Sequence, residues 1–151
     1  MGLNIASANV KKPDVQANTS NTSQQNVQIS AIGGTTLETQ VGTMSAYGPN
    51  CAGCSGHLGG GFDASGGNYI YNDPTYGNVR IVAGDSKYPY GTMIKVSNSK
   101  LGDFNAIVLD RGGAIGIGRR FMFDLLFASE AEAASFGTSY DVVFEVLRYG
   151  Y

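Results

Sequence analysis

The sequence predicts an all-β fold: a small closed barrel of about six short strands with one short helix, preceded by a flexible polar segment. Three observations support this prediction. The 151 residues include 22 glycines and 9 tyrosines, a composition typical of tight turns between short strands. The apolar residues fall in short runs bounded by Gly, Asn, Asp or Ser, and only one stretch has a helical pattern. The length suits one domain with a sizeable core.

The first part of the chain is polar. Residues 8–30 are dominated by Asn, Gln, Ser and Thr, and such a segment buries too little apolar surface to offset the entropy lost on ordering. We therefore expect residues 1–40 to form a flexible leader or linker, and residues 41–151 to form the barrel domain. Two alternatives stay open: the leader joins the barrel to another module or a larger assembly, or it has no partner.

Six segments have the signature of strands, each a short apolar run or alternation between turn residues. A glycine-rich turn region, Gly48–Gly67, separates the first from the second. A barrel is the expected arrangement because closure removes exposed sheet edges. The six segments are Thr43–Tyr47, Asn78–Ala83, Thr92–Val96, Ala106–Leu109, Phe121–Phe127 and Tyr140–Leu147.

One helix is expected between the last two strands. Ser129 fits the N-cap position, and Glu132 three residues later completes a capping box. The Ala- and Glu-rich residues that follow favour a helix, and Gly137 is placed to end it.

Composition and charge exclude several function classes. The net charge is −2 and the basic residues are scattered, so we expect no nucleic-acid partner. No run approaches the ~20 apolar residues that span a bilayer. Residues 1–10 lack the features of a signal peptide, so either an export signal lies outside this sequence or the protein leaves the cell by another route, such as lysis. Gly112–Gly118 lacks the Gly-Lys-Ser/Thr of a phosphate loop, and we expect no cofactor.

Three aspartates occupy positions of chemical interest. Asp85 follows one strand, Asp110 ends another, and Asp124 lies within the apolar run Phe121–Phe127. A carboxylate among large apolar side chains is desolvated, which disfavours its charged form, so Asp124 is a candidate general acid that stays protonated near neutral pH. The alternative is that Asp124 points outward from a half-buried strand. Asp85 and Asp110 have the alternative role of turn caps.

Cys51 and Cys54 lie among glycines, close to the single His57. Zinc requires about four ligands, and a thioredoxin-like motif opens a helix in a βαβ unit, so neither fits well. We favour a disulfide within the loop or two free thiols, and expect no metal site.

Four segments, in order over about 107 residues, resemble the three-aspartate domain family. This domain is shared with the catalytic barrel of membrane-bound lytic transglycosylase A and with spore and stationary-phase muralytic proteins. Asp85 lies in the segment similar to "VDP…IPLGT", Asp110 in that similar to "DTGGAI", and Asp124 in that similar to "IDLFF.SEAEA..FG". The segments are Ser45–Tyr47, Gly84–Thr92, Val108–Ile115 and Phe123–Gly137.

The resemblance implies a six-stranded double-psi β-barrel that binds peptidoglycan and cuts its MurNAc–GlcNAc β-1,4 bonds as a lytic transglycosylase. It implies that Asp124 is the catalytic acid, with Asp110 and Asp85 as its catalytic neighbours. It also implies an extracytoplasmic location at a cell wall or spore envelope, or in a phage virion or lysis system, with the leader as a link to a wall-binding module or virion. The substrate-binding residues that follow from it are Tyr47, Lys87, Thr92, Arg111, Gly112 and Gly113.

The chain departs from the family pattern in three places. The link between the second and third aspartates is about three residues longer than usual, Arg111 stands in place of Thr, and Gly84 in place of Val. Two other functions therefore stay open. The first is a hydrolase, which needs a second carboxylate that Asp85 or Asp110 could supply. The second is a non-catalytic, expansin-like module, which needs only a groove that binds the glycan.

Overall fold

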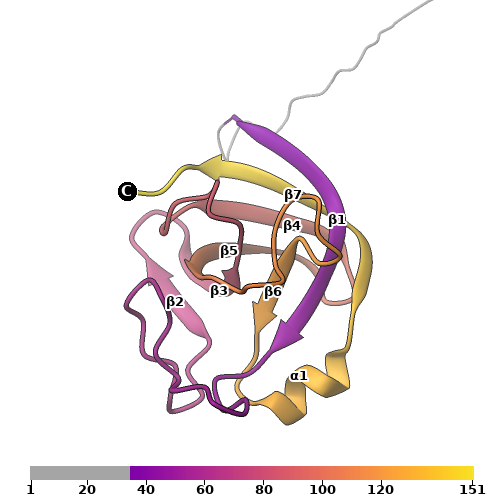
Figure 1. The fold of residues 1–151 in the computed structure, drawn as a ribbon. Helices are drawn as coiled ribbons and strands as arrows, with labels where there is room; N and C mark the ends of the chain where they lie inside the picture. The colour runs from indigo at the N-terminus through magenta and orange to yellow at the C-terminus, as the bar shows by residue number, and fades with distance from the viewer. Residues whose placement is uncertain (1–34) are drawn as a thin grey trace, which may run out of the picture. The chain divides into compact units, whose positions relative to one another are not determined.

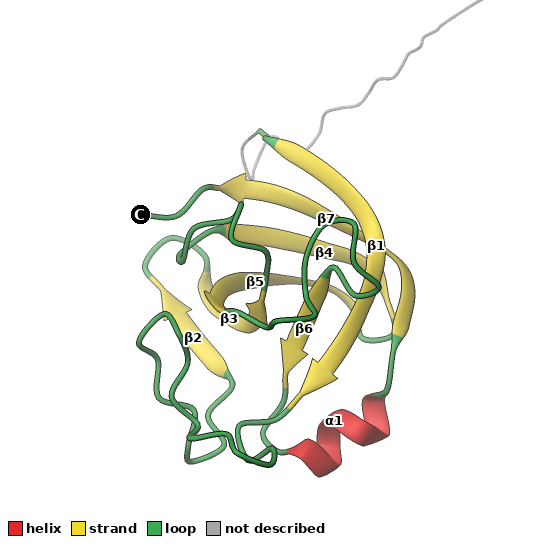
Figure 2. Ribbon diagram, in the orientation of Figure 1, coloured by secondary structure: helices red, strands yellow, loops and turns green. Residues whose placement is uncertain are grey.

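The computed structural model describes residues 35–151, and the greater part of the expected leader lies outside the described residues. Seven strands and one helix follow one another along the described chain (Figures 1 and 2). Within residues 35–151 no helix is long and apolar enough to cross a membrane. The elements are β1 (Glu38–Tyr47), β2 (Ile70–Asp73), β3 (Gly77–Ala83), β4 (Met93–Ser99), β5 (Gly102–Asp110), β6 (Phe123–Leu126), α1 (Glu130–Phe136) and β7 (Ser139–Arg148).

The strands form a closed six-stranded barrel, as the sequence predicts. The sheet order is β2-β3-β5-β4-β7-β1-β6, and a further pairing of β3 with β6 closes the ring. β2 lies outside the ring and pairs only with β3. It is an additional strand that the sequence pattern does not predict.

The pairing within the barrel has a two-fold internal symmetry. Exchanging β1 with β5, β3 with β6 and β4 with β7 maps each strand pair onto another of the same direction. The parallel pair β1–β6 becomes the parallel pair β5–β3, and the antiparallel pair β1–β7 becomes β5–β4. The antiparallel pairs β4–β7 and β3–β6 map onto themselves. This symmetric pair of parallel contacts is the arrangement expected for a double-psi barrel.

The barrel boundaries differ slightly from those expected. β1 begins at Glu38, so residues 38–40, expected in the leader, belong to the barrel. β6 covers only Phe123–Leu126 of the expected Phe121–Phe127, because Phe121 makes an isolated bridge with Ile115 instead.

The helix α1 begins and ends where its capping residues predict. Ser129 is extended, and its side chain accepts a hydrogen bond from the Glu132 backbone N–H at 3.2 Å. Gly137 ends the helix with a positive φ of 76°, and its N–H donates to the carbonyl of Ala133. The Ser129 cap therefore places the start of α1 only a few residues after the end of β6.

Two apolar clusters lie on opposite faces of the barrel wall. Alternate residues of all six barrel strands form the inner cluster, which includes Met44, Phe123 and Leu125. The outer cluster contains the residues between them, such as Leu109 and Leu126, and is covered by the loop that carries Leu58 and Ala64. This covering loop comprises residues 48–67, and its Gly59 N–H donates a hydrogen bond to Asp110 at the end of β5.

Candidate active site

Asp124 points to the outer face of the barrel, since its neighbours Phe123 and Leu125 belong to the inner cluster. β1 and β6 run parallel with Ser45 directly opposite Asp124. The Ser45 hydroxyl donates a hydrogen bond of 2.8 Å to Oδ1 of Asp124. The outward orientation, left open by the sequence, is therefore the one that occurs, but the side chain is still only partly exposed.

The environment of Asp124 favours its protonated form. Burial is the largest cause and raises the pKa to about 6, from an ordinary value of 3.8. The hydrogen bond from Ser45 acts in the opposite direction, whereas the negative charges of Glu130 and Asp110 raise the pKa further. A carboxyl group with a pKa of about 6 keeps its proton in roughly half of the molecules at pH 6 and roughly a tenth at pH 7, far more than an ordinary aspartate, and so can act as a general acid at mildly acidic to neutral pH.

Asp110 ends β5 and accepts a hydrogen bond on each carboxylate oxygen. The Tyr47 hydroxyl donates to Oδ2 at 2.7 Å, and the Gly59 backbone N–H donates to Oδ1 at 3.0 Å. Burial, followed by the charges of Asp110 and Asp124, raises the pKa of Tyr47. Its phenol therefore stays protonated and lies close to both carboxyl groups.

The covering loop meets the barrel at Gly59. A Cβ atom at this position would overlap the hydroxyl of Tyr90 and would lie 3.6 Å from Oδ1 of Asp110. Only glycine lets the loop backbone approach this closely. The guanidinium of Arg111 in turn stacks over the Tyr90 ring, 4.2 Å from the ring centroid.

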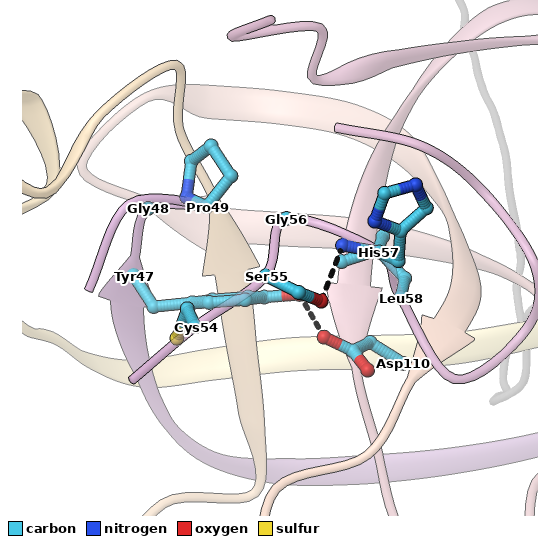
Figure 3. Close-up of a pocket in the computed structure, with 9 residues that line it drawn as sticks. All are labelled: Tyr47, Gly48, Pro49, Cys54, Ser55, Gly56, His57, Leu58 and Asp110. Carbon is cyan, nitrogen blue, oxygen red and sulfur yellow. Dashed lines mark hydrogen bonds between the residues drawn. The ribbon is translucent and has the colours of Figure 1, made fainter. Parts of the chain in front are cut away.

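A pocket of about 200 Å³ opens between the covering loop and the barrel, and Figure 3 shows the residues that line it. It contains both a carboxylate and an apolar wall, the combination found in small-ligand sites. It is lined by Tyr47, Gly48, Pro49, Cys54, Ser55, Gly56, His57, Leu58 and Asp110.

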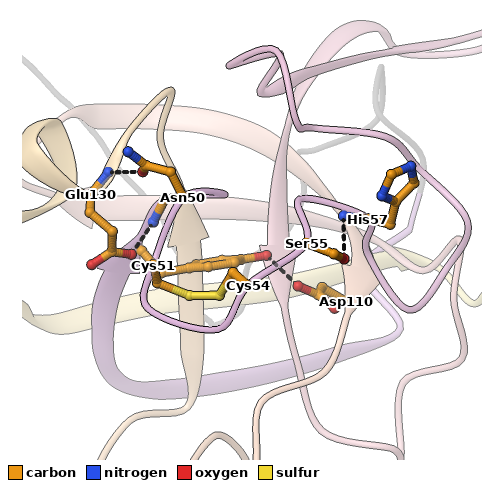
Figure 4. The surroundings of a disulfide bond; sticks show 9 residues. Asn50, Cys51, Cys54, Ser55, His57, Asp110 and Glu130 are labelled. Atoms are coloured by element: carbon orange, nitrogen blue, oxygen red, sulfur yellow. Dashed lines mark hydrogen bonds between the residues drawn. A yellow bond between two sulfur atoms is a disulfide. The ribbon is translucent and has the colours of Figure 1, made fainter.

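A disulfide and a carboxylate fix the covering loop. Cys51 is bonded to Cys54 (Figure 4), which is one of the two states expected for these cysteines. Next to them, the Gly48 N–H donates to Oε2 of Glu130 at 2.6 Å, and the Glu130 N–H donates to the Asn50 side chain at 2.8 Å. Within residues 35–151, no three His, Cys, Asp or Glu side chains are grouped as a metal ion would require.

Asp85 has a different role from the other two aspartates. Its carboxylate accepts hydrogen bonds from the backbone N–H groups of Lys87 at 2.8 Å and Ile117 at 2.9 Å. These two bonds are the main causes that lower its pKa. Asp85 is not among the charges that raise the pKa of Asp124. Asp110 is thus the aspartate whose charge acts on Asp124, and Asp85 anchors the link after β5 through Ile117.

Of the expected substrate-binding residues, Tyr47 alone lines the pocket. Thr92 is fully buried; its hydroxyl donates to the Pro89 carbonyl at 2.7 Å and accepts from the Gly150 N–H at 3.0 Å. It therefore stabilises a turn. Lys87 forms a 2.8 Å ion pair with Glu38 at the start of β1.

Arg111, Gly112 and Gly113 shape the link between β5 and β6. Arg111 donates to the Tyr88 carbonyl at 2.8 Å. The Gly112 carbonyl accepts from the Ile115 N–H at 3.0 Å, and the Gly113 carbonyl accepts from Arg119 at 2.8 Å. These contacts hold the loop itself.

The structure adds residues that the sequence does not single out. Ser45 bonds Asp124 directly, and Glu130 acts on Asp124 through its charge while it anchors the covering loop. Ser55 lines the pocket, and so does His57, which is considered from the sequence only as a metal ligand. Ser45 lies in a segment used for the family resemblance, but only the strand register reveals its contact.

In comparisons with known proteins, neither a family model nor a curated protein sequence matches this chain.

Proposed function

We propose that the protein is a peptidoglycan lytic transglycosylase in which Asp124 is the general acid. The observation that carries this proposal is the pKa of Asp124, raised to about 6 mainly by burial. This carboxyl group lies beside the pair of Asp110 and Tyr47, which faces an open pocket. The resemblance of the sequence to the three-aspartate domain family supports the same reaction.

In the proposed reaction Asp124 donates its proton to the glycosidic oxygen as the bond between that oxygen and C1 of MurNAc breaks. The resulting carboxylate then takes the proton of the C6 hydroxyl of the same sugar while that oxygen bonds to C1. The product is a 1,6-anhydro ring, and Asp124 regains its proton. General acid catalysis of this kind contributes on the order of 10²–10⁴-fold in rate.

Asp110 and Tyr47 have positioning and binding roles in this proposal. The negative charge of Asp110 helps to keep Asp124 protonated. Tyr47 offers a ring and a hydroxyl to a sugar at the pocket wall.

The contacts of Asp110 favour the transglycosylase over a hydrolase. A hydrolase needs a second carboxylate as nucleophile or to activate water. Both oxygens of Asp110 already accept a hydrogen bond, from Tyr47 and from Gly59. These bonds fix the orientation of the carboxylate and take up part of its hydrogen-bond acceptor capacity, which leaves less of it for a catalytic water or a sugar.

The proposed substrate places the protein outside the cytoplasm, at a cell wall or spore envelope, or in a phage virion or lysis system. The disulfide between Cys51 and Cys54 supports this location, because such bonds persist mainly in oxidising compartments.

The test is digestion of purified peptidoglycan sacculi, with the sugar ends identified by mass spectrometry. We expect 1,6-anhydroMurNAc ends from the wild type and none from Asp124→Asn. The matched control is Asp103→Asn, the same change at the opposite end of β5 from Asp110, which should cut normally. Reducing ends would instead indicate a hydrolase, and binding without release would indicate a glycan-binding module.

A further inference from the structure

A second pocket, of about 320 Å³, opens where β2 meets the chain that follows β7. Its walls include Tyr71 from β2, and Tyr149 and Tyr151 from the end of the chain. An ion pair, Asp73 with Arg148, forms its polar part. None of these residues contributes to the site around Asp124.

The ion pair is neutral as a unit. Arg148 donates to Oδ1 of Asp73 at 2.8 Å, and the N–H groups of Thr75 and Tyr76 donate to Oδ2 at 2.9 and 3.0 Å. The carboxylate is buried, whereas the Arg148 side chain keeps 34% of its surface exposed. The pocket therefore offers N–H donors without a net charge, which suits a neutral, hydroxyl-rich ligand better than an anion or a cation.

The tyrosines supply the apolar surface that such a ligand needs. Tyr149 is 41% exposed and Tyr151 is 86% exposed. The Tyr149 hydroxyl is held by Glu38 at 2.5 Å, and the Tyr151 ring lies against the Cα of Gly91, which has a positive φ of 94°. Partly fixed tyrosine rings present an apolar face with polar edges, and the face of a pyranose ring is apolar while its rim carries hydroxyls.

One residue connects this pocket to the candidate active site. The Tyr90 hydroxyl lies at Gly59, beside Asp110, while the Tyr90 backbone carbonyl accepts a hydrogen bond from the Tyr151 N–H at 3.2 Å. The ring of Phe62, from the covering loop, also packs edge-on against Tyr71, with centroids 6.3 Å apart. Tyr90 therefore reaches from the backbone of Tyr151 in the second pocket to the loop residue that binds Asp110 in the first.

We propose that the pocket around Tyr71, Tyr149 and Tyr151 is a second glycan subsite, which binds a sugar of the strand whose cleaved bond lies at Asp124. The proposal rests on the proposed function for the identity of the saccharide. A linear polymer bound at both pockets is held at two points, and the second contact raises its effective concentration at the first.

The test is an NMR titration of Asp124→Asn protein with a β-1,4-linked N-acetylglucosamine tetramer. This variant lacks the proposed acid, so binding is measured apart from cleavage. We expect backbone amide shifts at residues 149–151 and at Tyr71. In the same background, Tyr151→Ala should weaken binding about fivefold. Tyr140→Ala, an exposed tyrosine at the other end of β7, should leave the affinity unchanged.

Shifts confined to the residues around Tyr47 and Asp110 would overturn the second subsite and leave the proposed function intact. Equal affinity for the Tyr151→Ala and Tyr140→Ala proteins, or no binding at all, would also overturn it. If the wild type leaves sacculi uncut but the shifts at Tyr151 appear, the saccharide site stands and the transglycosylase proposal falls.

Discussion

The hydroxyl of Ser45 donates a 2.8 Å hydrogen bond to Asp124 across two parallel strands that place the two residues opposite each other. This bond stabilises the charged form of Asp124 and opposes the effect of burial on its pKa. Burial is the larger of the two effects, so the pKa stays raised at about 6. The balance between them determines the pH range in which Asp124 can donate a proton.

Replacing Ser45 with Ala should move the activity to higher pH. Without the hydrogen bond the charged form of Asp124 loses about 1.4 kcal/mol of stabilisation, which raises its pKa by about one unit. The alkaline limb of kcat/KM, which follows the loss of the acid's proton, should shift upward by about that amount. The measurement is the pH profile of anhydro-product release by Ser45→Ala and by a control, Ser97→Ala, on β4. An unchanged alkaline limb would contradict the role given to Ser45.

Asp124 should also make the folded state less stable as pH rises. Below about pH 4 its carboxyl group is protonated in both the folded and unfolded states. Between about pH 4 and 6 the unfolded chain releases a proton that the fold retains, because the pKa rises from 3.8 to about 6 on folding. The free energy of unfolding therefore falls through this window and stays lowered above it.

Asp124→Asn, which does not titrate, should escape this loss. Relative to that of the wild type, its free energy of unfolding should rise by up to about 3 kcal/mol between pH 4 and pH 7. Urea unfolding of both proteins at the two pH values measures the difference, with Asp103→Asn as the control. If the two proteins differ by the same amount at both pH values, burial does not raise the pKa of Asp124.

Much of the barrel could be predicted because local pattern determines it. Each barrel strand has an apolar alternation, and Ser129 and Gly137 mark the ends of α1. β2 was not predicted because it is four residues long and pairs with one strand only. Its stability comes from the edge of β3, which local sequence does not show.

The candidate site could be predicted only in part. The apolar neighbours of Asp124 indicate its position, but they do not show that its side chain faces outward and is still largely buried. Nor does spacing along the chain show that Asp85 accepts a hydrogen bond from the N–H of Ile117 in the longer link. The contacts of Ser45 and Glu130 depend on strand register and on loop position, neither of which follows from spacing along the chain.

Replacing Tyr47 with Phe should reduce activity more than stability. The change removes one of the two hydrogen bonds that hold Asp110 and the hydroxyl that lies near Asp124. We expect a fall in kcat of about tenfold, the equivalent of about 1.4 kcal/mol. Tyr88→Phe is the matched control, because Tyr88 is a buried tyrosine that donates to Glu38 at 2.7 Å, at the start of β1. An equal loss of activity in both variants would show that the effect is one of general stability.

Removing the charge of Asp73 should destabilise the fold. Its ion pair with Arg148 is the main cause that lowers its pKa, and the carboxylate is buried. Asp73→Ala leaves the Arg148 cation without its partner, at a cost of about 2–4 kcal/mol because Arg148 is partly solvated. Adding Arg148→Met should restore much of the loss, since replacing both partners of such a pair is often close to neutral.

The pH dependence of unfolding shows whether Asp73 stabilises the fold through the charge of its ion pair or through packing alone. A carboxylate whose pKa is lowered by folding stabilises the fold above its ordinary value of 3.8, and that contribution is lost as the pH falls below it. The gap in free energy of unfolding between wild type and Asp73→Ala should therefore be widest near pH 7 and narrow toward pH 3. Urea unfolding across this range measures it, and a gap that stays constant would mean that Asp73 acts through its shape and its turn contacts rather than its charge.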